Sequence, residues 1–80
     1  MNQKVHTFAS RVREELRSQK MSVADFAEEL EKTTSHVYLI FGKYDDTKRP
    51  WKVPTEKIIV PWADALGVEP GMLTGDDGGE

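Results

Sequence analysis

The sequence predicts an all-α domain of five short helices. Apolar residues recur at steps of three and four in five segments, which places them on one face of each helix. Residues that typically begin or end helices bound these segments, and no segment shows the alternation of a half-buried strand. A chain of 80 residues forms one domain, expected over residues 1–74. The acidic segment 75–80 has nothing to bury and is expected to be a disordered tail.

The first two predicted helices run to about Ser18 and from Ser22 to Leu30. Ser22 is a good N-cap, since its side-chain oxygen can accept a hydrogen bond from a free amide at the helix start. The expected inward residues are Val5, Phe8, Ala9, Val12 and Leu16 in the first helix, and Val23, Phe26, Ala27 and Leu30 in the second.

A third helix and a long loop follow. Thr33 can cap this helix, and Gly42 is a natural C-terminal stop. The polar, proline-bounded segment 43–54 is long for so small a domain, and long loops often carry function. The expected inward residues of the third helix are Val37, Ile40 and Phe41.

The fourth and fifth helices complete the predicted fold. Pro61 lies inside the fourth apolar stripe, and a proline deep in a helix costs about 3 kcal/mol, so this helix is expected to start late, near Ile59, or to be kinked. Gly67 ends it, and Pro70 lies near a first-turn position of the fifth helix. The inward residues are Ile59, Trp62, Ala63 and Leu66, then Val68, Met72 and Leu73.

Composition excludes several classes of protein. The chain has no cysteine, which excludes disulfides and thiol chemistry, and His6 and His36 are too few for a zinc site. No apolar stretch approaches the roughly 20 residues of a membrane span, and no signal peptide is visible, so we expect a cytoplasmic protein. Catalytic and nucleotide-binding motifs are absent from the sequence, so we expect no enzymatic activity, cofactor or small-molecule ligand.

The net charge of −3 argues against a nucleic-acid partner, but the charges are segregated. Residues 1–20 carry five Lys or Arg and two acids, and residues 43–57 carry five and three. Residues 21–42 carry one Lys or Arg and four acids, and residues 58–80 carry no Lys or Arg and five acids. The basic side chains are therefore gathered in the first helix and in the long loop.

The segment Met21–Gly42 has the order helix, short turn, helix, as in a helix-turn-helix DNA-binding unit. Ala27 is small enough to let two helices cross closely. The second helix of such a unit enters the major groove, where its first residues contact base edges and its free N–H groups favour a phosphate. The residues expected outward on this helix, and therefore at bases, are Thr34, Ser35, His36, Tyr38 and Leu39.

The stretch from Phe8 to Leu73 resembles the repressor/Cro family of lambdoid phages, also called the xenobiotic-response-element type of helix-turn-helix. The resemblance covers more than three quarters of the chain and rests on the order and spacing of short motifs. These motifs are Ser10-Arg11-Val12, Met21-Ser22, Phe26-Ala27, Thr33-Thr34, Thr47-Lys48-Arg49-Pro50 and Ala63-Asp64-Ala65-Leu66-Gly67-Val68.

The resemblance implies a five-helix domain that binds double-stranded DNA, usually as a homodimer on a palindromic operator. It implies base-contacting positions for Thr34, Ser35 and Leu39, and a phosphate-contacting loop. We therefore expect a transcription regulator, with repression favoured, that places helix 33–41 in the major groove. The expected phosphate contacts are Arg11, Thr33, Lys43, Lys48 and Arg49.

The sequence departs from the family pattern in several places. In the family, the position of Val23 is often a glutamine that contacts a phosphate, and the position of Glu31 in the turn is often a glycine. A non-glycine residue in a left-handed conformation costs about 1–2 kcal/mol. Leu16 and Phe41 replace a frequent Arg–Glu pair, which predicts an apolar contact there. The loop is several residues longer and carries Tyr44 and Trp51.

A protein-interaction module that keeps this fold and has lost DNA binding is the alternative. The acidic balance, the missing glutamine at position 23 and the acids at positions 28, 29 and 31 favour it. The long loop with Tyr44 and Trp51 would then be the binding surface. An antitoxin or a restriction-controller protein would use the same domain, and the sequence does not separate these roles.

Overall fold

The computed structural model describes residues 6–75, and all regular structure within this range is helical. The predicted all-α fold of five helices is therefore confirmed. Val5 and residues 76–80 of the expected tail lie outside the described residues, and Gly75 is the C-cap of the last helix. The helices are α1 (Phe8–Ser18), α2 (Val23–Leu30), α3 (Thr34–Lys43), α4 (Glu56–Leu66) and α5 (Pro70–Thr74).

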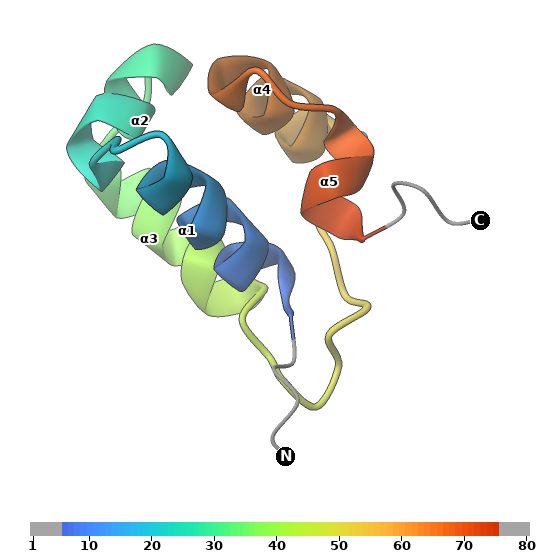
Figure 1. Ribbon diagram of the computed structural model, residues 1–80. Coiled ribbons are helices and arrows are strands. Elements are labelled where there is room, and N and C mark those ends of the chain that lie inside the picture. Colours follow the sequence, from blue (N-terminus) through green and yellow to red (C-terminus); the bar gives the residue numbers. More distant parts are fainter. Residues whose placement is uncertain (1–5, 76–80) are drawn as a thin grey trace.

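The helices that pack extensively against one another form a closed ring. α1 packs against α3 and α5, α2 packs against α3 and α4, and α4 packs against α2 and α5. Figure 1 shows α1 between α3 and α5, and the connection from α3 to α4 as a long loop that extends beyond the helices. Because α1 and α2 both pack against α3, the face of α3 that points away from them is left to solvent.

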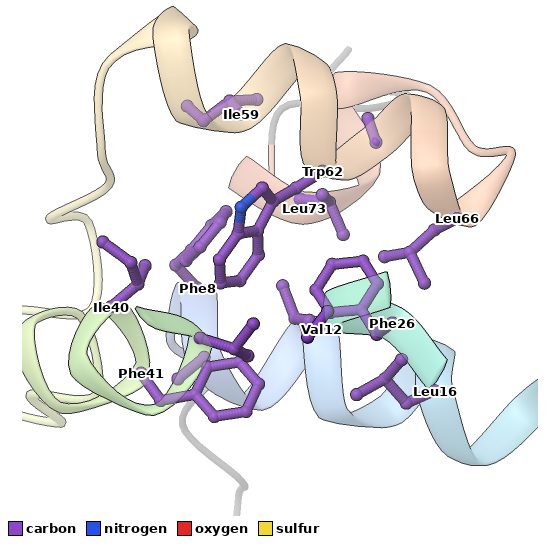
Figure 2. Packing of buried hydrophobic residues seen from close by; sticks show 14 residues of the cluster. Phe8, Val12, Leu16, Phe26, Ile40, Phe41, Ile59, Trp62, Leu66 and Leu73 are labelled. Atoms are coloured by element: carbon purple, nitrogen blue, oxygen red, sulfur yellow. The ribbon is translucent and has the colours of Figure 1, made fainter. Parts of the chain in front are cut away.

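Trp62 of α4 lies at the centre of the core. Its indole is 2% exposed and packs against Phe8, Phe26 and Phe41, with ring centroids 5.5, 5.0 and 5.9 Å away. The contacts with Phe26 and Phe41 are edge-to-face, which the quadrupoles of aromatic rings favour. The three phenylalanines belong to α1, α2 and α3, so one side chain joins four helices (Figure 2). The expectation that Trp62 belongs to the core is confirmed.

The rest of the core follows the predicted apolar faces. Leu16 and Phe41, between which an apolar contact was predicted, are both buried in the same cluster. Met72 was expected inward but is 38% exposed, because the short α5 buries only Leu73. The remaining buried apolar residues are Ala9, Val12, Ala27, Val37, Ile40, Ile59, Ala63 and Leu66.

Hydroxyl side chains begin the first three helices. Thr7 Oγ1 accepts from the Ser10 amide at 3.1 Å, while Ser10 Oγ accepts from the Thr7 amide at 2.8 Å, a reciprocal capping box. The Thr7 backbone is extended, so α1 begins at Phe8. Ser22 and Thr33 each accept from the amide three residues on, at 3.0 and 3.1 Å, which confirms both predicted N-caps.

Gly42 does not end α3, and this prediction was wrong. The Tyr44 amide still donates to the carbonyl of Ile40 at 3.1 Å, so the helix runs through Lys43. Gly42 is not among the residues with positive φ, and therefore does not take the left-handed conformation that makes glycine a helix stop. Gly67, in contrast, has φ 70° and closes α4 as predicted.

The expected late start of α4 was also wrong. The helix begins at Glu56, after the N-cap Thr55, and Pro61 lies well inside it. Proline has no N–H, so the carbonyl of Lys57 lacks its usual donor four residues on. Pro61 is exposed, and solvent can hydrate this side of the helix. Pro70 occupies a first-turn position of α5 as predicted.

The two tryptophans provide a matched test of the core. Trp62→Ala should lower the free energy of unfolding by about 3–5 kcal/mol, because it removes the ring that joins four helices. Trp51 is 71% exposed, so Trp51→Ala should change this free energy by no more than about 0.5 kcal/mol. Urea unfolding followed by far-ultraviolet circular dichroism measures both. Equal effects of the two substitutions would contradict the central place of Trp62.

Candidate nucleic-acid interface

The connection between α2 and α3 is short and tightly held. Glu31 has φ 60° and ψ 39°, the left-handed conformation, and its amide donates to the carbonyl of Glu28 at 3.0 Å. The amide of Lys32 donates to the carbonyl of Ala27 at 2.9 Å. Thr33 is extended and caps α3. These bonds fix the direction of α3 relative to α2. They also hold a glutamate in the left-handed conformation, which glycine adopts at the lowest cost.

One face of α3 is exposed along its length. Val37, Ile40 and Phe41 are buried, and each residue advances about 100° around a helix. By this geometry Ser35, Leu39 and Gly42 follow one line on the opposite side. All three are exposed, and no atom of residues 6–75 counted as a neighbour lies within 4 Å of a Cβ placed on Gly42.

Tyr38 and Leu39 make this face partly apolar. Tyr38 is 58% exposed and Leu39 is 60% exposed. The ring of Tyr38 packs edge-on against Phe41, with centroids 6.1 Å apart, so its direction is fixed by the core. A defined aromatic ring and a leucine therefore stand beside the hydroxyl groups at the start of the helix.

The first turn of α3 offers free hydrogen-bond donors. Thr33 Oγ1 accepts from the amide of His36, and no hydrogen bond to the amides of Thr34 or Ser35 is present within residues 6–75. These amides, together with the exposed hydroxyls of Thr33, Thr34 and Ser35, point out of the N-terminal end of the helix. Such an end attracts an anion or a polar edge.

His36 and Lys43 lie toward one border of the exposed face. His36 is half-buried and borders a cavity beside α4, where Lys57 and Pro61 also lie. Lys43 is exposed in the last turn, where a cation interacts favourably with the helix C-terminus. The predicted base contacts are thus brought onto one helix, but His36 turns toward α4 rather than lying on the outward line of Ser35 and Leu39.

The start of the long loop is held against α1. The carbonyl of Tyr44 accepts from the amide of Ala9 at 3.2 Å, and the Tyr44 ring packs against Phe8. The Asp45 carboxylate accepts from the buried hydroxyl of Thr7 at 2.8 Å and pairs with Arg13 at 3.1 Å. The exit from α3 is therefore fixed on the first turns of α1.

The middle of the loop is organised by Asp46. Its carboxylate accepts from the Lys48 amide at 2.9 Å and from Arg49 Nε at 3.0 Å. These two bonds hold the pKa of Asp46 below its usual value, so its charge and the pairing it supports persist to lower pH than those of a free aspartate. Lys48, Arg49 and Lys52 remain exposed around this turn.

Arg11 is not brought together with the other predicted site residues. It faces α5, and a Cβ placed on Gly75 would lie 2.9 Å from Arg11 Nη2. Arg13 lies on the α3 side instead, with its guanidinium 4.8 Å from the centre of the Phe41 ring. Arg13 was not among the site residues predicted from the sequence, because apolar periodicity does not say which neighbour lies on which side of a helix.

Residues 6–75 contain no cluster of three or more side chains that could hold a metal ion, and none of their helices is long and apolar enough to cross a membrane. Comparisons of the chain with protein-family models, with curated proteins and with solved structures gave no match.

The turn before α3 provides a stability test. Glu31→Gly should raise the free energy of unfolding by about 1 kcal/mol, because glycine relieves the left-handed strain at this position. Gly67→Ala, at the other left-handed helix end, should lower it by a similar amount. Chemical denaturation of both variants measures the two changes. A Glu31→Gly variant less stable than the wild type would show that the glutamate makes a compensating interaction.

Proposed function

We propose that this chain is a non-enzymatic, sequence-specific DNA-binding regulator that inserts α3 into the major groove. The observation that carries this proposal is the exposed face of α3, which combines small hydroxyl side chains, free amides and a fixed aromatic ring. A major groove about 12 Å wide admits an α-helix, and its base edges present both hydrogen-bond groups and thymine methyls.

The α2–α3 pair supports a helix-turn-helix interpretation. Three residues, Glu31, Lys32 and Thr33, separate the two helices, which is the usual length of the turn in this motif. The left-handed Glu31 stands where such turns often have glycine. α2 and α3 also pack against each other, as the two helices of this motif do.

The roles on α3 follow from side-chain chemistry. Thr34 and Ser35 can donate to or accept from base edges, and their small size lets the helix approach closely. Leu39 and Tyr38 are suited to thymine methyl groups, which present the apolar part of the groove. His36 lies farther from the outward line and is better placed at the border of the groove.

Phosphate contacts are assigned to the two ends of α3 and to the loop. Thr33 and the free amides lie at one end and Lys43 at the other, so together they span the helix. Lys48 and Arg49 are exposed on a loop whose start is fixed against α1. Arg49 exchanges its partner Asp46 for a phosphate on binding, and Arg11 is left out because it faces α5.

We further propose a homodimer on a two-fold symmetric operator. One small helical module buries a limited interface with DNA, and two modules on half-sites one helical turn apart raise both affinity and specificity. Repression, by occupation of a promoter, is the favoured outcome of such binding.

A salt-titrated binding assay tests this function, with the duplex upstream of the chain's own gene and a random duplex as targets. Arg49→Ala should weaken binding to both duplexes and lower the salt slope by about 0.9, because it removes one phosphate contact. Ser35→Ala should keep the slope but lower the preference for the promoter, by an amount on the order of 1 kcal/mol.

The wild type must bind the promoter more tightly than the random duplex for this proposal to stand. Weak and equal binding to both at low salt would refute it. The apolar exposure of Tyr38, Leu39 and Trp51 would then favour a protein partner, and the binding surface would be sought on α3 and the loop.

A further inference from the structure

A small cavity lies in the gap between α3 and α4. α3 and α4 are separated in the ring by α2, and they do not pack extensively against each other. The cavity has a volume of about 160 Å³, and Leu30, the last residue of α2, also lines it. A water molecule takes about 30 Å³ in the liquid, so the cavity has room for a tetrahedral anion with part of its hydration shell.

Three nitrogen-bearing side chains from three elements border this cavity. Lys32 comes from the α2–α3 turn, His36 from the first turn of α3 and Lys57 from the first turn of α4. Among residues 6–75, no carboxylate lines the cavity, although the full chain contains 14 acids and only 11 Lys and Arg. Neither lysine forms an ion pair, and the His36 ring forms no hydrogen bond, within the part of the chain that the structure describes.

The remaining walls are largely apolar. Ile58, Pro61 and Trp62 border the same cavity, and Trp62 belongs to the central core. The imidazole and the two ammonium groups can donate hydrogen bonds, and none of them carries a negative charge that would repel an anion. This combination of groups suits a phosphate.

We propose that Lys32, His36 and Lys57 form a phosphate-binding pocket that grips one backbone phosphate of the DNA beside α3. This inference rests on the proposed function and adds α4, which neither the sequence nor the resemblance assigned to the interface. His36, in the first turn of α3, lines the pocket, so a phosphate held there fixes the depth at which this helix enters the groove. Free inorganic phosphate carries the same chemical group as the DNA backbone and is the other possible occupant of this pocket.

Lysine-to-glutamine variants of the full chain test the pocket. Lys32→Gln, Lys57→Gln and the double variant are compared with Arg11→Gln, which removes the same charge from the α5 side of α1. Salt slopes are measured on a random duplex, and thermal midpoints by circular dichroism confirm that each variant is folded. If both lysines hold a single phosphate, the double variant should lose about 0.9 of the slope in total, and Arg11→Gln should keep the wild-type slope.

Two results on DNA would overturn this pocket while leaving the proposed function intact. One is an unchanged slope in the double variant. The other is a decrease of about 1.8 in the salt slope of the double variant, which would mean that the two lysines contact separate phosphates.

If the wild type binds no duplex, the proposed function fails and inorganic phosphate decides the pocket. At constant pH and ionic strength, phosphate should then shift the ring resonances of His36 saturably, with His6 as the internal reference, and the double variant should lose this shift. An equal shift in wild type and double variant, or no shift, would refute the pocket.

Discussion

The contacts of Trp62 with three phenylalanine rings are the interaction on which the rest of the structure depends. They join α4 to α1, α2 and α3 through one side chain, so the ring of helices closes around a single centre. In a domain this small, few other side chains could replace that burial. Phe41 is one of the three phenylalanines, and its burial sets the rotation of α3 about its own axis. The outward line of Ser35 and Leu39 is a direct consequence of that rotation.

The loop depends on the same centre through a second set of contacts. Phe8 packs against both Trp62 and Tyr44, and Asp45 bonds to Thr7 and Arg13 on the adjoining turns of α1. The exit from α3 is therefore fixed by α1, while the burial of Phe41 against Trp62 of α4 sets the rotation of α3. This arrangement lets a chain with a net negative charge present a basic loop near an exposed helix, because the position of the charges matters more than their sum.

Much of this fold could be predicted from the sequence, because its helices follow local rules. Ser22, Thr33, Gly67 and Pro70 act at helix ends as their chemistry requires, and the buried residues of α1 to α4 lie on the predicted faces. Gly42 was misread as a helix stop, and α4 begins at Glu56 rather than near Ile59, where the cost of Pro61 had placed one possible start. The sequence offered no sign of the cavity between α3 and α4, because it depends on how far apart two helices stand.

The candidate site was predictable only in part, because it depends on how the helices pack against one another. Periodicity placed Thr34, Ser35 and Leu39 on the outside of one helix, and these residues are exposed. It could not show that Arg11 faces α5 while Arg13 faces α3, because that distinction comes from the packing of α1 between two neighbours.

Amide chemical-shift mapping with the promoter duplex tests the central claim, that α3 is the DNA-reading helix, most directly. The account predicts the largest shifts at Thr34, Ser35 and Leu39, smaller shifts at Lys48 and Arg49, and none on the α1–α5 side at Glu14 and Met72. Shifts confined to the α1–α5 side, with an unperturbed α3, would contradict it.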